Sequence, residues 1–157
     1  MKNNNDYKEI EEKLGVRFES KDLLRNALIH RSYTNENKKE QKNNERLEFL
    51  GDAVLELIVT EFLFKHQKEE EGVLTSFRAS LVNTEILSNV ANKLNLADYL
   101  YLSKGEKNDI TSKSKKSILA DACEAIIGAI YLDQGFAKAK KFISDNIIIY
   151  FDNILKN

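Results

Sequence analysis

The sequence predicts an all-α fold in a single domain. Apolar residues recur at helical spacing along most of the chain, in segments rich in leucine, isoleucine, alanine, lysine and glutamate. The chain has no proline and only 6 glycines, so few positions would interrupt a helix. Its 157 residues are enough for one hydrophobic core, and no repeat, low-complexity block or long linker divides them. We therefore expect one helical domain over residues 1–157.

The N-terminal third is expected to hold two short helices and a loop. Residues 5–14 read as the first helix, which Gly15 closes at the position where helices favour glycine. Ser20 is a suitable N-cap for a second helix over residues 21–30. Residues 34–44 are strongly polar, which is typical of an exposed loop.

The middle of the chain is expected to begin with its longest helix, over residues 43–65. A further helix starts at Val73, with apolar residues at helical spacing on one side. Asn83 is a candidate N-cap for the next helix, which would run through Leu94. Residues 95–102 are short, apolar and aromatic, and would either anchor a loop or end a helix.

The C-terminal third is expected to hold a loop and two helices. Residues 103–116 are polar and mostly basic, and read as a loop. The helix Ser117–Asp133 is almost wholly apolar, and Gly135 marks its end. An amphipathic helix, Ala137–Leu155, would complete the chain.

Composition points to a cytoplasmic protein. The net charge of −1 argues neither for nor against nucleic acid, because the charges are grouped locally. The single cysteine, Cys123, lies in an apolar run and fits a reducing compartment as a core residue. The N-terminus lacks the apolar core of a signal peptide, and no apolar run reaches the roughly 18 residues of a membrane span. We expect no membrane association.

The long helix carries acidic residues at spacings that place them on one side. Glu45, Glu48, Asp52 and Glu56 follow one another at intervals of three or four residues. Such like charges repel by roughly 0.2–0.5 kcal/mol per exposed pair, and by more when the helix is buried. A positive group is expected to face them. For Glu45 and Glu56, a solvated helix face or a salt bridge is an equally good explanation.

A second acidic pair lies in the most apolar helix. Asp121 and Glu124 are the only charged residues between Ile118 and Leu132, and they share one helix face. An unpaired ionised carboxylate is costly in such surroundings. If this helix packs against the long one, four carboxylates converge and suit a hard cation such as Mg²⁺ or Mn²⁺. A cation held there could activate water for phosphodiester hydrolysis.

Five blocks of the sequence resemble one known family. They are, in chain order, "ALIHRSYTNE", "NERLEFLGDAVLE", "GVLTSFRASLVN", "LSKGE" and "ILADACEAIIGAIYLD". The second block resembles the signature of the ribonuclease III family, whose members cut double-stranded RNA, and the other four are similar to its flanking blocks. The resemblance covers nearly the whole chain. It implies that residues 1–157 form the family's catalytic domain, an all-helical nuclease domain that assembles as a homodimer.

The resemblance also assigns roles to acidic residues. The family's magnesium-binding and catalytic carboxylates match Glu48, Asp52, Asp121 and Glu124. Among them Asp52 and Glu124 are expected to be catalytic, with Glu124 bridging the metal or metals. Mn²⁺ is expected to substitute for Mg²⁺. Glu45 and Glu71 match further acidic positions of accessory role.

Other residues are assigned to the partners that the resemblance implies. Phe49 matches a residue that inserts into a socket on the partner subunit, although an ordinary core aromatic would explain it too. His30 and His66 read as structural or surface residues. The RNA-binding candidates beside the catalytic valley are Thr75, Ser76, Arg78, Asn83, Lys104, Lys113, Lys115 and Lys116.

The activity implied is hydrolysis of double-stranded RNA to 5′-phosphate and 3′-hydroxyl ends with short 3′ overhangs, in the processing of rRNA and mRNA precursors. Bacterial members carry a double-stranded-RNA-binding domain after the nuclease domain, and this chain stops near where that domain would begin. The alternatives are a stand-alone rRNA maturase similar to Mini-III and a catalytically silent RNA-binding module of nuclease fold. A plain helical dimerisation domain would leave the buried acidic pair unexplained.

Overall fold

The computed structural model describes residues 4–108 and 112–156 of the chain. The regular elements in these ranges are all helices, which confirms the predicted fold class. Apart from them, one isolated parallel bridge joins Ile29 to Tyr101. In chain order, the elements are α1 (Asn4–Leu14), α2 (Lys21–Ala27), α3 (Arg31–Glu36), α4 (Glu45–His66), α5 (Glu71–Leu81), α6 (Thr84–Lys93), the 3₁₀ turn η1 (Leu96–Tyr99), α7 (Lys104–Asn108), α8 (Ser112–Gln134), α9 (Phe136–Asn146), the 3₁₀ turn η2 (Ile148–Tyr150) and α10 (Phe151–Ile154).

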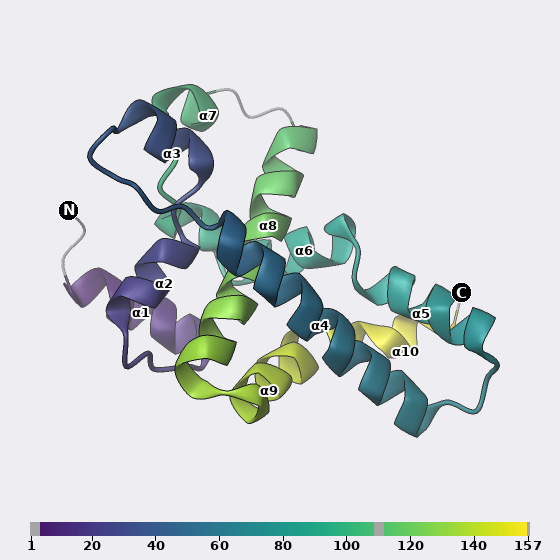
Figure 1. Cartoon of the computed structure of the whole chain (residues 1–157). Coiled ribbons are helices and arrows are strands. Elements are labelled where there is room, and N and C mark those ends of the chain that lie inside the picture. Colours follow the sequence, from purple (N-terminus) through teal and green to yellow (C-terminus); the bar gives the residue numbers. More distant parts are fainter. Residues whose placement is uncertain (1–3, 109–111, 157) are drawn as a thin grey trace.

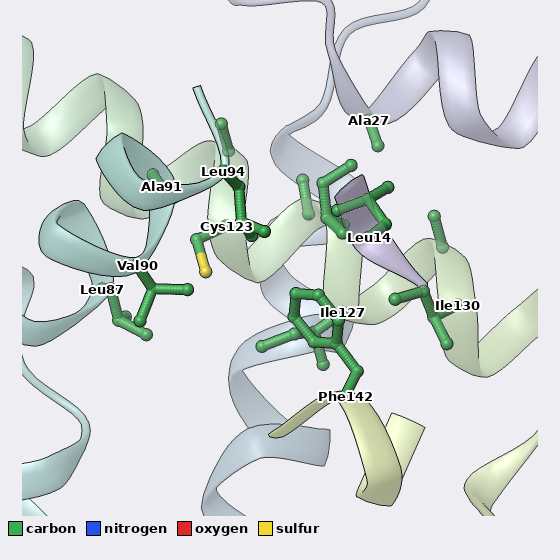
Figure 2. Close-up of a cluster of buried hydrophobic side chains, with 14 of the residues drawn as sticks. Leu14, Ala27, Leu87, Val90, Ala91, Leu94, Cys123, Ile127, Ile130 and Phe142 are labelled. Atoms are coloured by element: carbon green, nitrogen blue, oxygen red, sulfur yellow. The ribbon is translucent and has the colours of Figure 1, made fainter. Parts of the chain in front are cut away.

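The core is built around α8. This helix contacts α2, α4, α6 and α9, and its middle turns are fully buried. In Figure 2, Cys123 of α8 lies beside Val90 of α6 and Leu94, which follows α6, whereas Ile127 lies beside Phe142 of α9. The prediction that Cys123 is a core residue is therefore confirmed.

The crossing of α4 and α8 is the closest packing in the molecule, and two glycines permit it (Figure 1). A Cβ atom added at Gly51 of α4 would lie 1.7 Å from the backbone oxygen of Glu124. One added at Gly128 of α8 would lie 2.3 Å from the backbone oxygen of Leu47. Side chains at either position would force the two helices apart.

Most predicted helix boundaries agree with the structure. Gly15 follows α1 with a φ of 67°, in the left-handed region that glycine occupies without strain. Ser20 caps α2 by accepting the backbone N–H of Leu23, and Asn83 caps α6 by accepting that of Ile86. The predicted start at Val73 lies within the first turn of α5.

Two predicted loops were wrong in part, because they contain short helices. The loop over residues 34–44 includes the end of α3, and the loop over residues 103–116 includes α7 and the first turns of α8. Residues 109–111 lie outside the described part. The two short helices stabilise each other: Glu36 of α3 accepts the backbone N–H of Lys104 at 3.0 Å. Long-range caps of this kind leave no periodic pattern in the sequence.

Two further expectations need correction, and a third region had two alternatives between which the structure decides. The second helix ends at Ala27 and not at residue 30, because the backbone pairs with residue 101 from that point. Of the two alternatives for residues 95–102, the loop anchor is confirmed: the turn η1 within them is held by the buried side chains of Leu96 and Tyr99. The single last helix is divided at Ile147 into α9, η2 and α10.

As for membranes, none of the helices described is both long and apolar enough to span one.

Candidate metal centre

Three carboxylates from two helices meet at the crossing of α4 and α8. Glu48 of α4 and the pair Asp121 and Glu124 of α8 each offer an oxygen within 4.8 Å of the others. All three side chains are partly buried. The two helices that the sequence could only suggest as neighbours are thus packed together.

The close crossing explains why these side chains converge. Glu48 lies one turn before Gly51 on α4, and Glu124 lies one turn before Gly128 on α8. Since each glycine contacts the backbone of the other helix, the flanking carboxylates are brought face to face. The glycines were not singled out in the sequence. A glycine inside a strong helical pattern lowers helix stability by about 1 kcal/mol. Its presence in such a pattern therefore indicates a packing reason, and this signal could have identified the crossing from the sequence.

Asp52 extends the cluster on its exposed side. Its side chain is exposed, and it approaches Glu124 closely enough for the two carboxyl groups to share a hydrogen bond. All four carboxylates predicted as metal ligands are therefore at one place, with Glu124 beside each of the other three.

The electrostatics show that the cluster lacks a positive charge. Burial, followed by repulsion from Asp52, Glu48 and Asp121, raises the pKa of Glu124 from 4.5 to about 8. Burial also raises the pKa values of Glu48 and Asp121. A bound divalent cation would remove this penalty, and the donors of the cluster are all carboxylate oxygens, which Mg²⁺ and Mn²⁺ prefer. The residues present therefore fit such a cation.

A cleft of about 320 Å³ opens beside the cluster. Its walls include Glu48 and Asp121, and its rim carries Glu45 in an ion pair with Arg31 at 3.7 Å. The alternative that Glu45 forms a salt bridge is therefore confirmed, and Glu45 still faces the cleft. Sequence reasoning missed that Arg31 and Glu106 line the cleft, because they lie on the unpredicted helices α3 and α7.

The two histidines differ in position. His66 is exposed at the end of α4, as predicted. His30 has the predicted structural role, since its Nδ1 accepts the backbone N–H of Ser32 and caps α3. It also lines the cleft, which sequence reasoning did not foresee.

Glu71 lies apart from the carboxylate cluster within this chain. It begins α5 and accepts a hydrogen bond from the hydroxyl of Thr75 at 3.3 Å. Both residues border a separate hollow of about 250 Å³ together with Arg78, which donates to the hydroxyl of Thr60. Thr60 follows Glu48 by 12 residues on α4, which corresponds to about 18 Å along a helix.

The other RNA-binding candidates form two groups. Ser76 is exposed on α5, and Asn83 is occupied in capping α6. The predicted lysines are exposed around α7 and the first turns of α8, at positions 104, 113, 115 and 116. Lys116 is paired with Glu85 at 2.6 Å. The serines at 114 and 117 of the same helix line the cleft, so the basic group lies at its edge.

Phe49 is not a core aromatic in this chain. Its side chain is 82% exposed on α4. It borders a hollow of about 860 Å³ whose apolar lining includes Leu23, Leu50 and Leu132. An exposed ring next to an apolar hollow is a suitable surface for a second protein.

Comparison with known proteins gives a consistent result. The family model described as Ribonuclease-III-like matches residues 20–150. The chain is similar to Ribonuclease 3 of Borreliella burgdorferi, with 48% identity over 133 residues that cover 84% of this chain and 54% of that protein. Against Ribonuclease 3 of Sulfurovum sp., identity is 49% over 138 residues, covering 87% and 59%. The chain thus spans a little over half the length of these relatives.

Solved structures agree with this result. The nuclease domain of ribonuclease III from Campylobacter jejuni is similar at 44% identity with a TM-score of 0.79, covering 96% of this chain and 97% of that one. A second structure of that domain, described as flexible in a region involved in dimer formation, is similar at 47% identity with a TM-score of 0.77, covering 88% and 96%.

Proposed function

This chain belongs to the ribonuclease III family, and from that premise we propose that it is an endoribonuclease that hydrolyses double-stranded RNA with Mg²⁺. The observation that carries the proposal is the convergence of Glu48, Asp121 and Glu124, with Asp52 beside them, at the crossing of α4 and α8. A catalytically silent binding module would have no need of carboxylates that repel one another in a partly buried place.

The same four side chains would hold the cation. When bound, Mg²⁺, or Mn²⁺ in its place, would supply an activated water and would stabilise negative charge on the phosphate. Glu124 contacts each of the other carboxylates and is the proposed bridging ligand. Burial and the neighbouring carboxylates raise the pKa of Glu124 to about 8, so binding of a cation to its ionised form is expected to release a proton.

Asp52 is the more accessible of the two proposed catalytic residues. It lies on the exposed side of Glu124, where a phosphodiester can approach it from solvent. In the free protein its carboxylate raises the pKa of Glu124, so the two groups are close enough to act on the same cation. Glu45 remains a proposed accessory group at the rim of the cleft.

The exposed lysines near the cleft are proposed to hold the RNA backbone. A duplex of A-form RNA is recognised through its shape, its phosphates and its 2′-hydroxyls. Lys104, Lys113 and Lys115 are exposed beside the cleft, where they can reach phosphates, while Lys116 would first have to leave Glu85. Binding should therefore weaken steeply as salt is added. Thr75, Ser76, Arg78 and Asn83 of the α5–α6 region are proposed as a second contact, as the family resemblance implies.

A second copy of the chain is the proposed partner. In a two-fold dimer, Phe49 of one copy would fill the apolar hollow beside Phe49 of the other copy, and the reverse contact would form as well. Two sites would then cut the two strands and leave 5′-phosphate and 3′-hydroxyl ends with short 3′ overhangs. Glu71 lies far from its own cluster, so its proposed accessory role would be toward the partner's site. Processing of rRNA and mRNA precursors in the cytoplasm is the proposed setting.

A panel of substrates tests the proposed activity. The protein is incubated at low salt with a long RNA duplex, with single-stranded RNA and with duplex DNA, each with Mg²⁺ and with EDTA. We expect cutting of the RNA duplex alone, and only when Mg²⁺ is present. An RNA ligase should join the products directly, and should no longer join them after a phosphatase has removed their 5′-phosphates. Equal cutting of single-stranded RNA, or cutting in EDTA, would contradict the proposal.

A further inference from the structure

His30 lies in the wall of the cleft beside two of the proposed metal ligands. Its half-buried ring lines the same cavity as Glu48 and Asp121. Burial lowers the pKa of His30, which favours the neutral imidazole. A neutral imidazole has one N–H donor and one bare nitrogen, and the surroundings determine which is which.

The contacts of Nδ1 fix that choice. The backbone N–H of Ser32 donates to Nδ1 at 3.2 Å. Because a backbone N–H can only donate, Nδ1 is the bare nitrogen and Nε2 carries the hydrogen. The Ser32 hydroxyl lies 2.8 Å from Nδ1 and itself accepts the backbone N–H of Ser103 at 3.0 Å. The ring is therefore held on one side by α3 and by the chain leading into α7.

The Nε2–H on the other side of the ring is available for a new contact. Within residues 4–108 and 112–156, no hydrogen bond to Nε2 is formed, and none reaches the carboxylate of Asp121. Charged groups of four neighbouring elements act on the ring: Glu106 of α7 most strongly, then Arg31 of α3 with opposite sign, then Asp121 of α8 and Glu45 of α4. Among the acidic groups, Asp121 belongs to the carboxylate cluster.

We propose that His30 is a positioning residue of the metal centre, whose Nε2–H would donate to one oxygen of Asp121 once a cation is bound and leave the other oxygen aimed at that cation. The inference rests on the proposed function, since it takes the metal centre as given. Carboxylates that bind metals are themselves held by hydrogen bonds, and removing such a partner typically weakens metal affinity by about 10- to 100-fold. Asp52 and Glu124 lie side by side, whereas Asp121 shares the cleft wall with the donor of His30.

Two substitutions separate this role from capping. The Oδ1 of asparagine can take the place of Nδ1, so His30→Asn keeps the cap of α3 and loses the Nε2–H. The amide of glutamine can take the place of Nε2, so His30→Gln keeps the donor and loses the cap. Mn²⁺ affinity is measured without RNA, by the spectroscopic signal of free Mn²⁺, and the Tm of each metal-free variant is measured in parallel. His66→Asn, at the exposed histidine, is the matched control.

We expect His30→Asn to keep a Tm close to that of the wild type and to bind Mn²⁺ about 10-fold or more weakly. His30→Gln should lower the Tm and keep its Mn²⁺ affinity within about 3-fold of the wild type, well below the loss that removal of a ligand's partner produces. Unchanged Mn²⁺ affinity in His30→Asn would overturn the inference, and a raised KM for duplex RNA in that variant would then place His30 against the substrate. Equal losses of affinity in both variants would also overturn it, in favour of capping alone. If the wild type binds Mn²⁺ no better than Glu124→Gln, the metal centre itself fails, and the role of His30 fails with it.

Discussion

Glu124 is the residue at which the electrostatic cost of the cluster is concentrated. Its pKa of about 8 means that the folded protein keeps a proton that the unfolded chain loses near 4.5. Folding stability from this group is therefore fully present below about pH 4.5 and is lost as pH rises through about 8. A cation that binds the ionised form reverses this loss.

Replacement of Glu124 by its neutral isostere should stabilise the protein without metal. We expect Glu124→Gln to raise the Tm in EDTA at about pH 9, where Glu124 is ionised among three other carboxylates, and to leave it nearly unchanged at about pH 5. Added Mg²⁺ should raise the Tm of the wild type only. Calorimetry at the two pH values measures both effects, and a Tm of Glu124→Gln below that of the wild type at high pH would contradict this account of the cluster.

For single residues, the carboxylates of the site could be predicted from the sequence more readily than the residues around them. A pair of carboxylates in an otherwise apolar helix is a strong signal, and it correctly identified Asp121 and Glu124 as members of a cluster. Exposed residues carry no comparable signal, because a surface lysine looks the same whether it contacts RNA or water. The ion pair of Lys116 with Glu85 could not be foreseen, since its partners lie on different helices, 31 residues apart.

The crossing of α4 and α8 is the feature at the scale of elements on which the site depends. Both helices were predicted from their periodicity, because long apolar patterns are the most reliable sequence signal. Short helices were missed, since α3 and α7 are stabilised by contacts between residues about 70 positions apart, such as that from Ser103 to Ser32. Local sequence contains no record of these contacts.

Enlargement of a glycine at the crossing should separate the two helices. We expect Gly51→Ala to lower the free energy of unfolding by about 3 kcal/mol or more, because the added Cβ would lie 1.7 Å from the backbone of Glu124. Gly72→Ala is the matched control: it lies in α5 with no atom within 4 Å of the added Cβ, and should not destabilise. Urea denaturation measures both variants. Equal stability of Gly51→Ala and the wild type would show that the crossing is looser than described.

Over the whole molecule, the exposed apolar side chains of α4 point to association. Phe49, Leu57 and Phe64 are all exposed, and their spacing of about two helical turns places them on one side of the helix. The same helix carries Glu48 to the cleft and Asp52 to the exposed side of the carboxylate cluster. Association along this face would therefore bring two carboxylate clusters near each other, which is what cutting of both strands of a duplex requires.

Truncation of Phe49 should weaken that association. We expect Phe49→Ala to raise the dimer dissociation constant by about 30-fold, the effect of removing an aromatic anchor from an apolar pocket. Ile149→Ala, at another exposed apolar position near the C-terminal end, should have little effect. Sedimentation velocity over a dilution series measures both. A dimer of unchanged stability in Phe49→Ala would remove the socket role.

The central claim, that the carboxylates at the α4–α8 crossing form one catalytic centre, is tested most directly by the rate of RNA duplex cleavage in Mg²⁺. The variants compared are the wild type, Glu48→Gln, Asp52→Asn, Asp121→Asn, Glu124→Gln and the control Glu12→Gln, which alters an exposed carboxylate of α1. The account predicts that each of the four site variants loses cleavage by on the order of 100-fold or more, with the largest loss for Glu124→Gln, while Glu12→Gln cuts like the wild type. Cleavage by Glu124→Gln at the rate of the wild type would contradict it.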